Sequence, residues 1–273
     1  MPVFARTKKR HAFVGLGLIV STMAGLMAGS HSLGTVSPAL RGAPSGRTTG
    51  NLPRVMLWAW ERPEDLRFVE PRQVGVAFLA RTVFLSDDNV VLRPRLQPLT
   101  VTPGTALAAV VRIESSRAEP PTLSDAQRGQ AVRAIAATAD LPGVSAVQVD
   151  FDAATSERKF YRSLLEDLRK QLTSSTSLSI TALASWCLDD NWLEGLPIDD
   201  AVPMLFRMGP DRRNVLLRLS KGEDFRAGVC RQSTGISTDE PLPSLLPGRR
   251  IYVFRPKAWS PEAVQAVLNE VRP

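Results

Sequence analysis

The strongest constraint on the fold is a regular alternation of short apolar runs with amphipathic stretches between residues 55 and 254. This alternation is typical of repeated βα units around a parallel sheet. We expect eight strands, at Val55–Trp60, Val76–Thr82, Leu107–Ile113, Ala146–Phe151, Leu178–Trp186, Val202–Arg207, Phe225–Cys230 and Ile251–Phe254.

Helices are indicated after only some of these strands. Ser124–Ala139 begins with a serine suited to cap a helix and continues with an apolar stripe at helical spacing. Glu157–Leu172 has a similar stripe, and a third helix begins at Ser260, which is followed by a proline. By contrast, residues 87–102 are expected to form an irregular or strand-rich insertion, and residues 209–224 one short helix.

Eight strands with intervening helices within residues 51–273 most simply form one α/β domain, a (β/α)8 TIM-barrel-like fold in which some helices are trimmed or irregular. An open doubly wound sheet is the alternative. No G-x-G-x-x-G follows the first strand and no G-x-x-x-x-G-K-[ST] occurs, so no nucleotide fingerprint favours the open sheet.

The N-terminus has the pattern of an export segment. A basic stretch at residues 6–10 precedes an uncharged apolar run, Phe13–Gly29, so residues 1–32 are either a signal peptide or an N-terminal membrane anchor. Residues 33–50 are rich in Gly, Ser, Thr and Pro and are predicted to be a flexible tether. We therefore expect a periplasmic or extracellular protein, or one anchored to the outer face of the cytoplasmic membrane.

The formal charge of +7 does not indicate a nucleic-acid partner. Six of the positive charges lie in residues 1–50, which leaves +1 for residues 51–273. A nearly neutral domain lacks the sustained basic surface that phosphate binding needs. We expect no nucleic-acid partner, and membrane contact only through the N-terminal segment if it is not cleaved.

Histidine and cysteine usage narrows the chemistry further. Both histidines, His11 and His31, lie in the export segment, which excludes a zinc site and a Ser-His-Asp or Cys-His arrangement from the domain. Cys187 and Cys230 fall at or near the ends of predicted strands five and seven, and strands two apart exceed the ~7 Å between Cα atoms that a disulfide allows. We expect free buried thiols, or a disulfide only if the loops bend inward, and no cofactor or metal.

The fourth predicted strand runs through Val144–Asp152 and is the most informative segment. Strand alternation divides it into two faces. The face expected to pack on the helices carries Val147, Val149 and Phe151. The face expected to point into the barrel and its C-terminal mouth, where barrel enzymes keep their active sites, carries Gln148, Asp150 and Asp152.

The same alternation on the third strand points Arg112 and Glu114 inward, beside the fourth strand. Arg207, near the end of the sixth strand, adds another cation. Buried charges cost desolvation energy and persist when they are paired or when they serve chemistry. Two interpretations therefore remain open: an Arg112–Asp150 ion pair that fills the barrel, or a functional site.

Tryptophans stand at two predicted strand ends. Trp58, Trp60 and Glu61 close the first strand, and Trp186 closes the fifth. Aromatic faces beside carboxylates and arginines suit a sugar ring, which has an apolar face and hydroxyl edges. The alternative for any single tryptophan is packing between strand and helix.

Four stretches together are similar to a known family: WAWERPEDLRF, VQVDFDAATSERKFYRSLLEDLR, SITALASWC and AVPMLFRMG. They resemble the exported bacterial family called domain of unknown function 3142, over most of residues 53–259. The resemblance implies a barrel similar to glycoside hydrolases. The fourth strand is then similar to the chitinase-type D-x-x-D-x-D-x-E motif, whose final Glu is the proton donor. The strand can be aligned with this motif in two ways. In the first alignment, Ala154 stands at the position of the final Glu. In the second, Asp152 stands at that position and Gln148 stands where the motif usually has an Asp.

The sequence thus predicts a carbohydrate-active, glycoside-hydrolase-like barrel of the cell envelope, with a polysaccharide or other glycan as partner. Paired carboxylates are what glycoside hydrolysis requires. We expect Asp152 to be the acid/base, Asp150 to tune its pKa by like charge, and Glu114 to be the partner carboxylate. The alternative is a non-catalytic barrel that binds glycan or protein. The expected substrate-binding residues are Trp58, Trp60, Glu61, Arg112, Gln148, Trp186 and Arg207.

Overall fold

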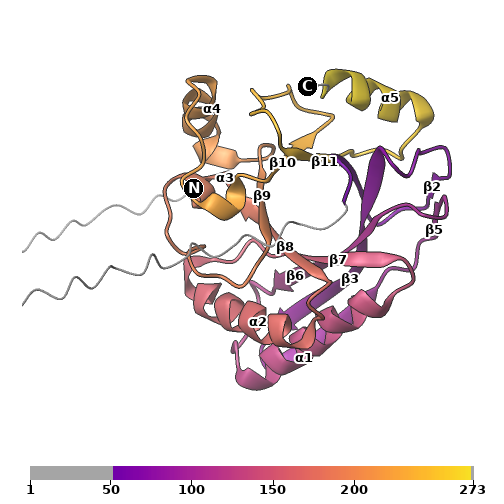
Figure 1. Cartoon of the computed structure of the whole chain (residues 1–273). Helices are drawn as coiled ribbons and strands as arrows, with labels where there is room; N and C mark the ends of the chain where they lie inside the picture. The colour runs from indigo at the N-terminus through magenta and orange to yellow at the C-terminus, as the bar shows by residue number, and fades with distance from the viewer. Residues whose placement is uncertain (1–51, 272–273) are drawn as a thin grey trace, which may run out of the picture. The chain divides into compact units, whose positions relative to one another are not determined.

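The computed structural model describes residues 52–271 (Figure 1). The predicted export segment, residues 1–32, and tether, residues 33–50, lie outside the described residues. Within residues 52–271, no helix is both long enough and apolar enough to span a membrane.

Eight parallel strands close into a barrel. β1 pairs in parallel with both β3 and β11, and each remaining strand pairs with its neighbours, so the sheet has no gap. This confirms the predicted (β/α)8 TIM-barrel-like fold. In the order around the barrel, the strands are β1 (Val55–Ala59), β3 (Val74–Ser86), β6 (Leu107–Ser115), β7 (Val144–Asp150), β8 (Ser177–Leu183), β9 (Asp200–Met204), β10 (Ser233–Ser237) and β11 (Arg250–Phe254).

Five α-helices accompany this barrel (Figure 1), and some strand connections have none, as predicted. They are α1 (Asp125–Ala136), α2 (Arg158–Gln171), α3 (Ala184–Leu188), α4 (Arg212–Ser220) and α5 (Pro261–Glu270). The connection after β3 instead forms an antiparallel hairpin with β4 (Asn89–Pro94), and β2 (Glu64–Leu66) pairs with β5 (Leu99–Val101). The 3-10 turns are η1 (Ala137–Asp140), η2 (Thr155–Glu157), η3 (Gly209–Asp211) and η4 (Gly228–Cys230).

Two of the three predicted helix starts have the side-chain caps expected of them, and α2 begins after Glu157 without one. Ser124 Oγ accepts from Gln127 N at 3.3 Å, and Gln127 Oε1 accepts from Ser124 N at 3.3 Å, which is a reciprocal capping box. The Gln127 amide nitrogen also donates to Asp87 O and Asn89 O, so the same side chain ties α1 to the β3–β4 hairpin. Ser260 Oγ accepts from Ala263 N at the start of α5.

Strand alternation sorts the hydrophobic core as predicted for β7. Val147, Val149 and Phe151 pack outside the barrel against α1 and α2, in what we call the outer cluster. Ala146, one residue out of phase, belongs to a separate inner cluster inside the barrel. The inner cluster contains Met56, Trp58, Ala77, Ala108, Val110, Ala146, Val202, Phe206 and Tyr252, with Leu52, Trp60, Met204 and Phe254 packed against them.

The prediction of the seventh strand is wrong. Residues 225–230 form a loop that ends in η4, and the barrel strand is β10 (Ser233–Ser237). Phe225 and Cys230 are fully buried, but as anchors of this loop in the outer cluster. The true strand has the sequence Ser-Thr-Gly-Ile-Ser. Its central residue, Gly235, lies against the indole of Trp58, and a Cβ at this position would come within 2.9 Å of the ring.

The expectation of free thiols is also wrong, because Cys187 and Cys230 form a disulfide with Cα atoms 5.9 Å apart. Neither cysteine lies on a strand: Cys187 is in α3 and Cys230 in η4. Both are fully buried in the outer cluster with Ala201 and Leu205 of the β9 segment. The two turns therefore meet over the strand that separates β8 from β10.

A buried carboxyl at the opposite end of the barrel from the strand C-termini makes stability depend on pH. Asp200, the first residue of β9, accepts from Ser233 Oγ at 2.5 Å and lies 3.9 Å from Arg250 Nη1. Burial raises the pKa of Asp200 to about 6, well above the ordinary value of an aspartate. A raised pKa means that the folded state disfavours the ionised form of this carboxyl. The unfolding free energy therefore falls as pH rises from about 4 to 6, and it stays at the lower value above about pH 6.

We expect this group to cost the wild-type protein up to about 3 kcal/mol of unfolding free energy between acid and neutral pH. Asp200→Asn has no such cost, so its unfolding free energy is expected to exceed that of the wild type at neutral pH and to change less with pH. Urea denaturation of both proteins at pH 4, 5, 6 and 7 measures the difference. Parallel pH dependences would contradict the assignment.

Candidate functional site

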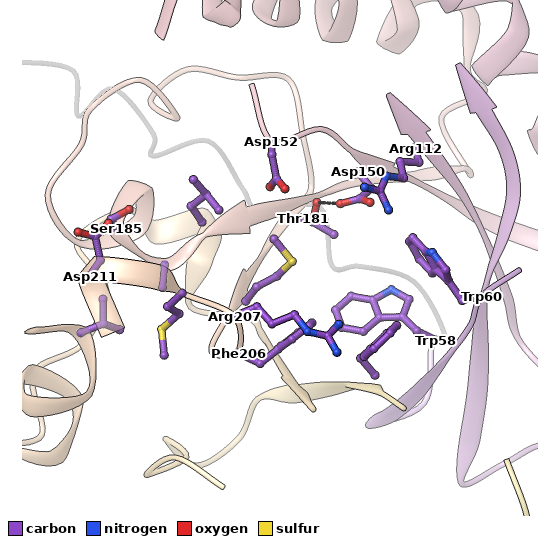
Figure 2. Close-up of a pocket in the computed structure, with 16 residues that line it drawn as sticks. Trp58, Trp60, Arg112, Asp150, Asp152, Thr181, Ser185, Phe206, Arg207 and Asp211 are labelled. Atoms are coloured by element: carbon purple, nitrogen blue, oxygen red, sulfur yellow. Dashed lines mark hydrogen bonds between the residues drawn. The ribbon is translucent and has the colours of Figure 1, made fainter. Parts of the chain in front are cut away.

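A cavity of about 300 Å³ opens at the C-terminal ends of the barrel strands (Figure 2). Its walls come from the ends of β1, β6, β7, β8, β9 and β11 and from the chain between β8 and α4. This is the end at which barrel enzymes place their catalytic groups. The volume lies at the lower end of the range of small-molecule sites.

Asp150 is the last residue of β7 and lines the cavity wall. Thr181 Oγ1, on the neighbouring strand β8, donates to Asp150 Oδ1 at 2.6 Å (Figure 2). Burial raises the pKa of Asp150, and the negative charge of Asp152 raises it further, against the opposing effects of Thr181 and Arg112. Asp150 is therefore held in one orientation and binds its proton more tightly than an ordinary aspartate.

Asp152 lies two residues further along, lines the same cavity (Figure 2) and is exposed to solvent. Although its side chain is more exposed than that of Asp150, burial against the surrounding protein raises its pKa, and Arg112 partly offsets the effect. Burial is the main cause of the raised pKa at both aspartates, and the like-charge effect that the sequence predicted at Asp152 acts instead on Asp150. A carboxyl with a raised pKa that still reaches solvent can donate and recover a proton.

Arg112 and Glu114 both leave β6 toward the mouth, but only Arg112 lines the cavity. Arg112 Nε lies 2.9 Å from Glu114 Oε1, so Glu114 is held beside the site rather than within it. The interpretation in which an Arg112–Asp150 ion pair fills the barrel is wrong, because the arginine pairs with Glu114 and leaves Asp150 to Thr181.

Aromatic rings form one end of the cavity, which we call the aromatic end: Trp58, Trp60, Phe206 and Phe254. Trp58 is almost fully buried and packs 5.3 Å from the Tyr252 ring centroid. Trp60 is less buried and meets Phe254 edge to face at 6.2 Å. The aromatic end thus presents flat apolar surfaces beside the two aspartates and Arg112 (Figure 2).

Gln148 lies below the cavity and not in its wall. It is fully buried inside the barrel, where its Oε1 accepts from Trp58 Nε1 at 2.9 Å and its Nε2 donates to Ser179 Oγ at 3.3 Å. Because both ends of the amide are used, Gln148 fixes the indole of Trp58 rather than contacting a ligand. Gln148, which was predicted to bind substrate, instead positions the indole of Trp58 in the structure.

Two other predicted residues are not brought to the cavity. Trp186 lies in α3 and packs in the outer cluster, 4.9 Å from Trp192 and with Arg158 over its ring. The reason is that β8 ends at Leu183, so strand alternation no longer applies at residue 186. Glu61 is exposed in the loop after β1 and does not line the cavity.

Arg207 lies at the rim of the cavity, as predicted, in an unusual backbone conformation. Its φ of 52° lies in the left-handed region, and its backbone nitrogen donates to Glu240 Oε1 at 2.8 Å. The guanidinium lies 4.8 Å from the Phe254 ring centroid and pairs with Asp239 at 3.2 Å. Left-handed non-glycine residues persist where the surroundings hold them, so this arginine is fixed over the aromatic end.

Sequence reasoning missed several residues of the cavity wall. Thr181 could have been found, because alternation along the fifth predicted strand places it on the same face as Ser179. The others lie at or beyond the ends of strands, where periodicity sets the path of the chain less strictly. They are Leu183, Ala184, Ser185, Met204, Phe206, Met208, Asp211, Val215 and Phe254.

Two solved structures are similar in fold to this chain. The Bacillus cereus spore cortex-lytic enzyme SleL is 17% identical with a TM-score of 0.47, and the match covers 80% of this chain. The chain spans only 58% of the length of that enzyme. A chitinase, RmChi1, from Rhizomucor miehei is 10% identical with a TM-score of 0.37, and the match covers 66% of this chain and 67% of the chitinase.

Neither a model of a protein family nor a curated protein sequence matches this chain. The family resemblance described from the sequence therefore stays a prediction, and the site is interpreted from its own residues.

Proposed function

We propose that this chain is a glycoside hydrolase of the cell envelope. The observation that carries the proposal is the pair Asp150 and Asp152, whose pKa values are both raised, in the wall of a cavity with an aromatic end. A carboxyl that stays protonated can donate its proton to a glycosidic oxygen, as glycoside hydrolysis requires. Aromatic faces hold a sugar ring beside them.

Within this proposal, Asp152 is the general acid because it lines the cavity and is exposed to solvent. Asp150, fixed by Thr181, lies beside this acid in the cavity wall. Arg112 and Arg207 donate hydrogen bonds to hydroxyl or acidic groups of the sugar, and Trp60 stacks on it. Glu114 supports the site by orienting Arg112.

The proposed location is outside the cytoplasm. The buried disulfide Cys187–Cys230 suits an oxidising compartment, and the basic and apolar pattern of residues 1–32 suits export. The substrate class is then an extracytoplasmic glycan.

A panel of polysaccharides and aryl glycosides tests the proposal with the intact protein. We expect release of reducing ends, with kcat/KM falling as pH rises through the raised pKa of Asp152, because the acid must be protonated to act. The measurement is a pH–rate profile from pH 3 to 9. Activity that rises steadily through neutral pH, or no turnover on any member of the panel, would contradict the proposal.

One observation favours a second candidate, a barrel that binds glycan without cleaving it. Glu114, the carboxylate predicted to complete the catalytic pair, lies outside the cavity in an ion pair with Arg112. Equilibrium binding of the same panel separates the two candidates. Saturable binding without turnover supports the binding barrel, whereas turnover excludes it.

A further inference from the structure

The cavity has a second end that the proposed sugar site does not use. Its wall carries four aliphatic side chains, Leu183 and Ala184 at the β8–α3 junction and Met208 and Val215 before and within α4, and the polar residues Ser185 and Asp211 of the same two segments also line it. We call the four aliphatic residues the apolar end. Leu183 remains 36% exposed even though it is a large apolar side chain.

The two ends belong to different parts of the core. The rings of the aromatic end pack with the inner cluster, whereas Ala184, Val215 and Met208 pack with the outer cluster. Figure 2 shows Ser185 and Asp211, which neighbour the apolar end in sequence, on one side of Asp152, and Trp60 and Arg112 on the other. Asp152 therefore lies between the aromatic end of the cavity and a second half in which the four aliphatic side chains accompany Ser185 and Asp211.

The apolar end is held in place by covalent and ionic links. Cys187, three residues after Ala184, is bonded to Cys230, which fixes α3. Arg218 of α4 pairs with Asp189 directly after α3, so the two helices that carry the apolar end are tied together. A preformed aliphatic wall binds an apolar group without a large cost of ordering.

Resting on the proposed function, we infer that the substrate is an amphiphilic glycoside, a sugar joined to an aliphatic aglycone that lies in the apolar end. A general acid must contact the oxygen that links sugar to leaving group, and Asp152 occupies that position between the two halves. Leucine, methionine, valine and alanine offer no stacking surface for a second sugar ring. Methionine adapts its shape to flexible chains, which suits an alkyl group.

The test is a chain-length series of methyl, butyl and octyl β-D-glucosides, each kept below its micellar concentration. Binding is followed by tryptophan fluorescence, because Trp58 and Trp60 line the cavity. We expect the dissociation constant to fall about fourfold for each added methylene that enters the apolar end. Equal affinity for the methyl and octyl glucosides would overturn the inference.

The test compares two variants. The cavity variant carries both Leu183→Gln and Met208→Gln, and the control variant carries Leu217→Gln. Leu217 is half exposed on α4 and lies outside the cavity, so its substitution is a control for the loss of a surface leucine. We expect the cavity variant to lose most of the chain-length dependence and the control to keep it. Leu183→Gln alone, at an already exposed position, serves if the double variant does not fold. Equal losses in the cavity variant and the control would overturn the inference.

This test separates the inference from the proposed function. Chain-length-dependent binding without hydrolysis of any glycoside refutes the hydrolase and leaves the apolar site standing. Hydrolysis of glycans with no effect of the aglycone chain on KM supports the hydrolase and refutes the apolar site.

Discussion

Asp152→Asn is expected to lower kcat on a hydrolysed glycan by about a hundred- to ten-thousand-fold, the usual contribution of a general acid. Asparagine has nearly the same shape as aspartate but cannot donate a proton to the leaving oxygen. Because Asp152 reaches solvent and forms no ion pair with Arg112 in the structure, the change should leave the fold intact. Glycan affinity should be retained.

The matched control is Asp140→Asn. Asp140 is an exposed aspartate at the end of η1, four residues before the first residue of β7 and therefore near the opposite end of the barrel from the cavity. We expect wild-type kcat for this variant. Initial rates, equilibrium binding and thermal unfolding are measured for both variants and the wild type. If Asp152→Asn keeps more than a tenth of the wild-type kcat, Asp152 is not the acid.

The barrel and Asp150 could be predicted because both follow from periodicity, and Asp152 keeps the same phase two residues beyond the end of β7. Along β7, alternation alone separates the outward Val149 from the inward Asp150, and closure of the barrel then places the aspartates at the mouth. The same rule placed Arg112 correctly on β6. Positions on regular strands are fixed by backbone geometry, which the sequence pattern reports directly.

The residues beyond the strand ends could not be predicted in this way. Trp186 follows β8 by only three residues, yet the turn into α3 sends it to the outer cluster. Asp211 and Met208 reach the cavity through a turn whose path depends on tertiary contacts. The whole apolar end lies at or beyond the ends of strands, which is why the sequence indicated sugar-stacking residues but no aliphatic half.

The disulfide is another feature that depends on the chain beyond the strand ends and that strand periodicity does not predict. Counting strands places Cys187 and Cys230 too far apart, because two strand spacings amount to roughly 9.5 Å. The structure brings them together because α3 and η4 both lie over β9, where the backbone nitrogen of Ala227 also donates to Cys187 O at 3.1 Å. A pairing that depends on two irregular turns cannot be read from periodicity.

Replacing both cysteines by serine is expected to lower the unfolding free energy by about 4 kcal/mol, the chain-entropy value for a crosslink between residues 43 apart in sequence. Both side chains are fully buried, so the serine hydroxyls would add a desolvation cost. Urea denaturation of the wild type and of Cys187→Ser/Cys230→Ser, without reductant, measures the loss.

Reductant supplies the internal comparison for this prediction. It should move the denaturation midpoint of the wild type toward that of the double variant and leave the variant unchanged. Because the disulfide fixes α3, the double variant is also expected to bind octyl glucoside more weakly than the wild type does. Its affinity for methyl glucoside is expected to equal that of the wild type. A loss of stability below about 1 kcal/mol would mean that packing of the outer cluster, rather than the crosslink, holds the two turns together.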